Sequence, residues 1–351
     1  MQPSQHFSKA ASALRVVALL LCLALTLGLL AGCGKTAPGD QEDAKELVDL
    51  TLSEVVHSIF YAPQYVAMQL GYFEEEGINL TVDLGNGADK CMTALLSDNA
   101  DIILCGTEAG IYIHAEGRED VPLVFAQLTQ RAGNFLVGRE EDPDFTWDDV
   151  RGKTIIGGRP GGMPEMVLEY ILHQNGIQVG TDVEVITNLD LSATGSAFVS
   201  GTGDYTAEFE PGATTLESAG QGYVVASLGV DSGYVPYTVY MTTSSKIEEN
   251  PELVQGFTNA INNGLEWCAQ HTSEEIAKVI HPQFSETSLE DLTAIVERYK
   301  AQDTWVTSPV MTEESLTLIQ DILQFSGTLT TPVDYEDIVV TQFAEQAAAS
   351  K

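Results

Sequence analysis

The fold of this chain is decided by one stretch of sequence, Phe60-Tyr-Ala-Pro-Gln-Tyr-Val-Ala-Met-Gln-Leu-Gly-Tyr-Phe-Glu-Glu-Glu-Gly-Ile-Asn-Leu80. Its first half predicts a helix over residues 62–70, because Pro63 suits a first helical turn and the Gly71-Tyr-Phe segment ends the helix. From residue 78 to residue 84 apolar and polar side chains alternate, which predicts a half-buried strand. The stretch therefore predicts a helix that leads directly into a strand.

Strand and helix patterns alternate on both sides of this stretch. Apolar runs or alternation predict strands over residues 48–52, 100–105, 121–128, 154–157, 183–186, 222–228 and 237–242. Helices are predicted over residues 90–96 and 165–174, each after a Gly-rich loop. This alternation predicts an α/β fold with largely parallel strands and with helices on both faces of the sheet.

The C-terminal part of the chain has a helical pattern. It begins after Pro251 and continues nearly to the end of the sequence. Two segments, Thr272-x-x-Glu275 and Thr287-x-x-Glu290, are predicted to be capping boxes, each before an apolar helix. A last helix is predicted over residues 311–325.

The N-terminus carries the pattern of a secretion signal. Lys9 and Arg15 precede an apolar run, residues 16–30, that is shorter than the roughly 20 residues a membrane span needs. The following Leu30-Ala-Gly-Cys33 resembles a bacterial lipobox, in which Cys33 becomes the lipidated first residue of the mature protein. We therefore expect a lipoprotein signal peptide over 1–32, a lipid-anchored flexible tether over 33–46, and an extracytoplasmic protein at the outer face of the cell membrane. An uncleaved N-terminal anchor is the alternative.

Composition limits the partners and the chemistry. The chain has 51 Asp and Glu against 16 Lys and Arg, a formal net charge of −35, which argues against nucleic acid and anionic lipid as partners. Beyond the signal and Cys33, the cysteines are Cys91, Cys105 and Cys268, without the spacing of a metal site. We find no GxSxG, HExxH, GxGxxG or GxxxxGK[ST] motif. These observations favour a protein that is not an enzyme, and the sequence predicts no cofactor and no metal.

The stretch from Phe60 to Leu80 resembles the opening of the SsuA/THI5-like (NMT1-type) substrate-binding proteins, which serve ABC importers of the nitrate, sulfonate, taurine and thiamine-pyrimidine class. Similar segments follow in the family's order: Gly87-Ala-Asp-Lys, Ala94-Leu-Leu, Ala100-Asp-Ile, Trp147-Asp-Asp-Val-Arg-Gly-Lys-Thr-Ile and Ile247-Glu-Glu-Asn-Pro-Glu-Leu-Val. The resemblance implies a type II periplasmic-binding-protein fold, in which a ligand cleft lies between two α/β lobes joined by two hinge crossovers. Lobe 1 would comprise residues 47–135 plus 240–351, and lobe 2 residues 136–239.

Candidate ligand-binding residues follow predicted strands, because ligands of open α/β sheets bind beyond the carboxyl ends of the strands. Aromatic side chains there can stack on a flat ligand, and Gly-rich loops expose backbone N–H groups. The segment Glu208-Phe-Glu-Pro211 lies where the family often carries aromatic and acidic residues facing the cleft. The predicted residues are His57, Phe60, Tyr61, Asn86, Gly87, Ala88, Gly106, Thr107, Gln127, Arg159, Gly161, Gly162, Met163, Phe209, Glu210, Tyr234 and Tyr237.

The charge of the ligand stays open at this point. Arg159 would bind a carboxylate, sulfonate or phosphate, whereas Glu210 would accept hydrogen bonds from an amine. For each candidate residue the alternative is a structural role, such as core packing or helix capping. Sulfonates, nitrate, a thiamine-precursor pyrimidine and riboflavin all remain candidate ligands.

The resemblance implies a monomeric solute-binding lipoprotein that captures a small molecule outside the membrane and delivers it to an ABC permease. Two other functions stay open. One is an enzyme on the same fold, such as a THI5-like pyrimidine synthase or a menaquinone-pathway lyase, although the Cys-rich iron-binding segment of the synthases is not found. The other is a membrane-tethered ligand sensor.

Overall fold

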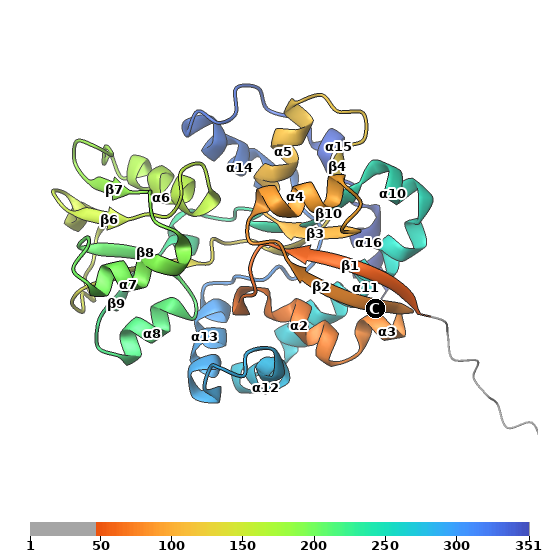
Figure 1. The fold of residues 1–351 in the computed structure, drawn as a ribbon, viewed down its shortest axis with the longest axis horizontal. Coiled ribbons are helices and arrows are strands. Elements are labelled where there is room, and N and C mark those ends of the chain that lie inside the picture. Colours follow the sequence, from red (N-terminus) through yellow and green to blue (C-terminus); the bar gives the residue numbers. More distant parts are fainter. Residues whose placement is uncertain (1–46, 351) are drawn as a thin grey trace, which may run out of the picture. The chain divides into compact units, whose positions relative to one another are not determined.

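The computed structural model describes residues 47–350, which form one compact unit containing two five-stranded sheets (Figure 1). The first sheet has the strand order β2-β1-β3-β10-β4, and the second has the order β7-β6-β8-β5-β9. The strands of the first sheet are β1 (Val48–Glu54), β2 (Ile78–Leu84), β3 (Ile102–Cys105), β4 (Pro122–Thr129) and β10 (Thr238–Thr243). Those of the second are β5 (Asn134–Gly138), β6 (Thr154–Ile156), β7 (Glu184–Ile186), β8 (Tyr205–Phe209) and β9 (Tyr223–Ser227).

Helices cover the sheets and form the C-terminal part of the chain. Up to β9 they are α2 (Ala62–Gln69), α3 (Tyr72–Glu75), α4 (Ala88–Leu96), α5 (Thr107–Ala115), α6 (Met163–Gln174), α7 (Thr194–Val199) and α8 (Gly212–Ser218). After β9 they are α9 (Leu228–Asp231), α10 (Ser244–Glu249), α11 (Pro251–Gln270), α12 (Ser273–Ile280), α13 (Leu289–Ala301), α14 (Glu313–Phe325), α15 (Tyr335–Ile338) and α16 (Gln342–Ala349). Short 3₁₀ turns occur at Ile59–Tyr61, Trp147–Val150, Leu191–Ala193 and His281–Gln283.

Two strands run against the others. β1 pairs in parallel with β2 and β3, and β6 pairs in parallel with β7 and β8, as the alternating pattern predicts. β5 is antiparallel to β8 and β9, and β10 is antiparallel to β3 and β4. Each is the first strand after the chain passes from one sheet to the other. These two passages bring the ends of β4 and β9 to the junction between the sheets.

The stretch that decides the fold forms the predicted elements. α2 has Pro63 in its first turn, and β2 has the predicted bounds, 78–84. The structure also contains β5 and β8, two strands that the sequence does not predict. The capping box at Thr272 is confirmed, with reciprocal bonds to Glu275. The one at Thr287 is wrong, because the N-cap of α13 is Ser288.

Helix α13 and the segment after it connect the two sheets. The Tyr299 hydroxyl donates to the carbonyl of Gly133 at 3.1 Å and accepts from the backbone N–H of Glu210 at 3.4 Å. The Trp305 indole donates to the carbonyl of Phe60 at 2.9 Å. Figure 1 shows α13 beside α8, and Arg298 of α13 pairs with Glu217 of α8. These contacts hold the chain that follows β1 next to the second sheet.

The predicted signal peptide, Cys33 and the tether lie outside the described residues. Within residues 47–350, none of the helices is both long and apolar enough to cross a membrane.

Candidate ligand-binding site

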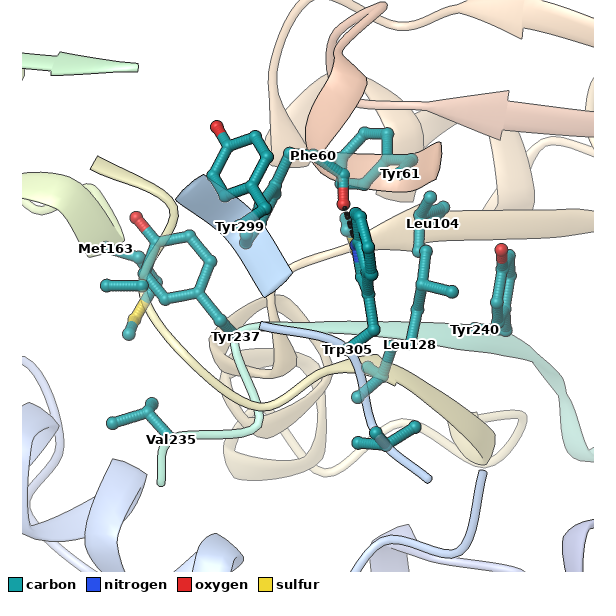
Figure 2. Close-up of a cluster of buried hydrophobic side chains, with 14 of the residues drawn as sticks. Phe60, Tyr61, Leu104, Leu128, Met163, Val235, Tyr237, Tyr240, Tyr299 and Trp305 are labelled. Carbon is teal, nitrogen blue, oxygen red and sulfur yellow. Dashed lines mark hydrogen bonds between the residues drawn. The ribbon is translucent and has the colours of Figure 1, made fainter. Parts of the chain in front are cut away.

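Six aromatic side chains meet at the junction of the two sheets, and we call them the aromatic cluster: Phe60, Tyr61, Phe209, Tyr237, Tyr299 and Trp305 (Figure 2 labels all but Phe209). The ring centroid of Phe60 lies 5.4 Å from that of Tyr299 and 5.8 Å from that of Tyr237. Phe209, at the end of β8, lies 6.2 Å from Phe60. These distances are typical of edge-to-face and tilted aromatic pairs. The cluster thus joins residues that follow strands of both sheets.

Local backbone features fix the position of Phe60. The Ser58 hydroxyl accepts from the Phe60 N–H at 3.2 Å and so starts the 3₁₀ turn after β1. The Phe60 ring lies directly on the backbone of Gly133, where an added Cβ would come within 2.7 Å of the ring. A side chain at position 133 would therefore displace the central ring of the cluster.

Three buried polar side chains, one in the cluster and two beside it, have atoms without hydrogen-bond partners, and we call them the polar trio: Glu108, Asn134 and Tyr237. They are 7%, 0% and 5% exposed, respectively. The unpartnered atoms are Oε2 of Glu108, both side-chain polar atoms of Asn134 and the hydroxyl of Tyr237. A buried polar atom without a partner costs about 1–3 kcal/mol. Such atoms are rare in folded proteins, and a bound molecule is one explanation for them.

The first member of the trio lies at the start of α5, directly after β3. The Thr107 hydroxyl donates to the carbonyl of Pro236 at 2.6 Å, which fixes the first turn of α5 beside Tyr237. The Glu108 carboxylate folds back over Gly106, where an added Cβ would lie 1.9 Å from Oε2. Burial raises the pKa of Glu108 to about 7. Burial, and then the charge of Glu108, raise the pKa of Tyr237 well above its usual range.

Asn134 approaches the cluster from the second sheet. It lies opposite Phe209 in the antiparallel pair of β5 and β8, so both side chains are on the same face of that sheet. The ring of Phe209 lies 6.5 Å from that of Tyr237. The amide of Asn134 is therefore next to the cluster, on the side of the second sheet.

The structure brings some of the predicted site residues together and separates others. Those in or next to the cluster are Phe60, Tyr61, Gly106, Thr107, Phe209, Tyr237 and the buried Met163, the first residue of α6, which Figure 2 shows with the cluster. Gln127 is buried in β4, and its amide donates to the carbonyl of Thr129 at 3.0 Å.

Loops hold a second group of predicted residues. Asn86, Gly87 and Ala88 form the loop and first residue before α4, where Asn86 is exposed and has a positive φ of 58°. Arg159 is exposed, and the N–H of Gly161 donates to Glu165 at 3.1 Å, while Gly162 is the N-cap of α6.

Three further predicted residues have partners within the chain. His57 lies 3.1 Å from Glu54 and 2.9 Å from the carbonyl of Gln283, and the hydrogen bond to Glu54 raises its pKa. Tyr234 is 52% exposed and donates to Asp303 at 3.0 Å.

Glu210 is the third of these residues. Its carboxylate forms an ion pair with Arg298 and accepts from the N–H of Thr214 at 2.9 Å. Its bonds are therefore made inside the protein.

Sequence reasoning missed four residues of the site: Glu108, Asn134, Tyr299 and Trp305. Glu108 follows a predicted strand, but the hydroxyl of its neighbour Thr107 is the more typical side chain for the start of a helix, and Thr107 is the candidate. Asn134 lies next to the predicted boundary between lobe 1 and lobe 2, where the sequence predicts no strand. Tyr299 matches the apolar face of a helix, which indicates only that it is buried.

The cysteines and possible metal ligands of the described residues bear on other chemistry. Cys91, Cys105 and Cys268 are free and buried, and burial raises the pKa of each thiol. Among residues 47–350, no group of three or more His, Cys, Asp or Glu side chains is placed to hold a metal ion. Two surface hollows, of about 410 and 420 Å³, are lined by residues outside the cluster.

A model of the NMT1/THI5-like family matches residues 59–275. YtlA of Bacillus subtilis (strain 168), which carries the name of a binding protein, is 41% identical over 305 residues, 87% of this chain and 91% of YtlA. The chain belongs to the NMT1/THI5-like family. The resemblance predicted from the sequence is thereby confirmed.

One further relative and one solved structure are also similar to this chain. The formylaminopyrimidine-binding protein of Halalkalibacterium halodurans is 24% identical over 347 residues, which cover 86% of this chain and 98% of that protein. The ligand-binding component of an ABC-type import system from Staphylococcus aureus has a TM-score of 0.68 at 16% identity, covering 86% of this chain and 99% of that structure. The NMT1/THI5-like chain thus has the periplasmic-binding-protein fold, which confirms the predicted fold class.

Proposed function

We propose that this protein is an extracytoplasmic solute-binding lipoprotein, which captures a small organic molecule at the aromatic cluster and delivers it to an ABC permease. In this proposal the ligand cleft lies between lobe 1 (47–135 plus 240–351) and lobe 2 (136–239), and closure about the two crossovers buries the ligand. Lipid on Cys33 holds the protein at the membrane, and the protein acts as a monomer without a catalytic step.

The observation that carries this proposal is the polar trio beside the aromatic cluster. Binding sites for small molecules combine apolar and aromatic surfaces with a few converging polar groups. Here the polar groups are buried and unpartnered, so a ligand that bonds to them would remove a cost that the ligand-free protein bears. Rings around these groups would exclude water from the same place.

The relatives support import over catalysis. YtlA and the formylaminopyrimidine-binding protein are both named as binding proteins, and a structural neighbour belongs to an ABC-type import system. An enzyme on this fold would need a reactive group at the site. The buried thiols with raised pKa values are poor nucleophiles, which disfavours chemistry at a cysteine.

The test is to identify what the protein retains. The full chain, expressed in a bacterium and extracted from membranes in detergent, is denatured, and the released small molecules are measured by mass spectrometry. We expect about one molecule per wild-type chain. Asn134→Leu should lose it, because this substitution replaces the unpartnered amide with an apolar group of similar size.

Asn79→Leu is the matched control, because Asn79 is exposed on β2, away from the cluster. It should retain the molecule like the wild type. The proposal fails if the wild-type chain releases no small molecule, or if Asn134→Leu retains as much of it as the wild type does.

A further inference from the structure

We propose that Glu108 sets the charge class of the ligand: the site takes a flat molecule that donates N–H bonds, or carries a positive charge, and rejects anions. Asn134 and Tyr237 are then its other polar contacts. This inference rests on the proposed binding function and adds the class of the ligand.

The position of Glu108 is the first argument. The start of an α-helix presents free N–H groups and a partial positive charge, which normally attract an anion. In this chain the carboxylate of Glu108 itself lies over the start of α5, close enough to Gly106 that a Cβ there would meet both of its oxygens. An anionic ligand would meet this carboxylate where it would otherwise meet the helix terminus.

The second argument is that no cation of residues 47–350 forms an ion pair with Glu108. Arg298 pairs with Glu210 and Glu217. The guanidinium of Arg131 lies 3.9 Å from the centroid of the Tyr234 ring and donates through Nη1 to the carbonyl of Gly229, while its Nε is buried without a partner. A buried carboxylate without a cation attracts positive charge and repels a second anion.

The third argument is that the polar trio has mixed hydrogen-bonding capacity beside aromatic rings. Oε2 of Glu108 accepts, the Asn134 amide both donates and accepts, and the Tyr237 hydroxyl does either. Amino groups on a planar heterocycle, or an amidine, present matching N–H donors at the edge of a flat ring. The rings of Phe60, Phe209 and Tyr237 provide faces and edges for such a ring. A cation gains further from the negative faces of these rings.

A series of probes with one ring and different head groups tests this inference: benzamidine (cation), benzamide (neutral) and benzenesulfonate (anion). Dissociation constants are measured by calorimetry on the full chain in detergent at pH 8, where the Glu108 carboxyl is ionised because its pKa is about 7, after removal of retained molecules. We expect benzamidine to bind at least about tenfold more tightly than benzenesulfonate, because a charge-assisted hydrogen bond supports it and repulsion opposes the anion. The dissociation constant of benzamide should lie between those of benzamidine and benzenesulfonate.

Glu108→Gln is the decisive variant, because it keeps the shape and removes the charge. It should reduce the preference for benzamidine over benzenesulfonate by about tenfold or more. Tyr237→Phe, the second variant, should weaken the binding of benzamidine and benzamide by loss of one hydroxyl contact. Glu252→Gln, at an exposed position on α11, is the control and should leave all three constants unchanged.

The inference is overturned if wild-type protein binds benzenesulfonate as tightly as benzamidine, if it binds none of the probes, or if Glu108→Gln keeps the wild-type preference. These outcomes are distinct from failure of the proposed function. A wild-type chain that still retains a small molecule lost by Asn134→Leu remains a binding protein, and only the assigned ligand class falls. If the wild-type chain retains no small molecule, both proposals are wrong.

Discussion

Arg298 of α13 forms an ion pair with Glu210, the residue that directly follows β8, and the Glu210 side chain is completely buried. The same guanidinium also pairs with Glu217 on α8. This arrangement joins the helical C-terminal part of the chain to the second sheet. Glu210 thus has its partners within the protein, and in the proposed site Glu108 is the acid that a ligand would meet.

The first prediction concerns this ion pair. Arg298→Met leaves the carboxylate of Glu210 buried without a cation, and we expect the free energy of unfolding to fall by about 3–5 kcal/mol. Urea unfolding of the full chain in detergent, followed by tryptophan fluorescence, measures the change. Adding Glu210→Gln to the variant should restore part of the loss, because the unpaired charge is then removed.

Arg151 offers a matched control. It pairs with Asp148 and Asp182 in a more exposed position. Solvent screens such pairs, so Arg151→Met should change stability little. If Arg298→Met lowers the free energy of unfolding no more than Arg151→Met does, the ion pair with Glu210 does not stabilise the contact between α13 and the second sheet.

The second prediction concerns pH. The pKa of Glu108 is raised to about 7 in the folded protein, from an ordinary 4.5. The folded chain therefore binds this proton more tightly than the unfolded chain does, and the free energy of unfolding falls as the pH rises from about 4.5 to about 7. A pKa difference of about 2.5 corresponds to about 3 kcal/mol. At pH 8 the free energy of unfolding of ligand-free Glu108→Gln should exceed that of the wild type by about this amount.

At pH 4 the Glu108 carboxyl is protonated in both the folded and the unfolded wild-type chain. The variant and the wild type should therefore have nearly equal free energies of unfolding. Urea unfolding at the two pH values provides the measurement. An equal difference at both pH values would show that Glu108 does not titrate as its buried position requires.

Much of the first sheet can be predicted from the sequence, because its signals are local. The alternation from Ile78 to Leu84 and the helix with Pro63 in its first turn each depend on neighbouring residues. β8 is harder to predict, because its buried positions include the acid Glu208, which breaks the apolar pattern of a central strand. Thr287 and Ser288 both suit an N-cap, and the sequence does not show which one starts α13.

The aromatic part of the candidate site is partly accessible from the sequence. Phe60 follows a predicted strand and Tyr237 lies near the predicted lobe boundary at residue 239, whereas Phe209 is a candidate only through the family resemblance. The polar part is not accessible in this way. Glu108 and Asn134 stand out only because they are buried and their polar atoms find no partner, and both properties depend on contacts with distant segments. The sequence likewise does not show that Glu210 pairs with Arg298, because the two residues are far apart in the chain.

The third prediction concerns the contact of Phe60 with the backbone at position 133. Gly133→Ala places a Cβ within 2.7 Å of the ring and should displace it, with a loss of about 1–3 kcal/mol in stability. It should also weaken retention of the small molecule. Gly195→Ala is the control, because its added Cβ would meet nothing closer than 3.7 Å. If the two variants retain the molecule equally, Phe60 is not part of the site.

The fourth prediction concerns the anchor. Cys33→Ser removes the thiol that would carry the lipid, so the chain should move from the membrane fraction to the soluble fraction. More than one acyl chain is needed for stable anchoring, and mass spectrometry of the N-terminal peptide would count them. A Cys33→Ser chain that stays in the membrane fraction would favour an uncleaved N-terminal anchor.

The most direct test of the account is a crystal structure of the protein with the small molecule that it retains. We predict a flat ligand against the ring of Phe60, with polar atoms within about 3.2 Å of Glu108 Oε2 and of the Asn134 amide. A ligand bound elsewhere, or one that leaves Glu108 and Asn134 without partners, would contradict the central claim that the junction of the two sheets is the binding site.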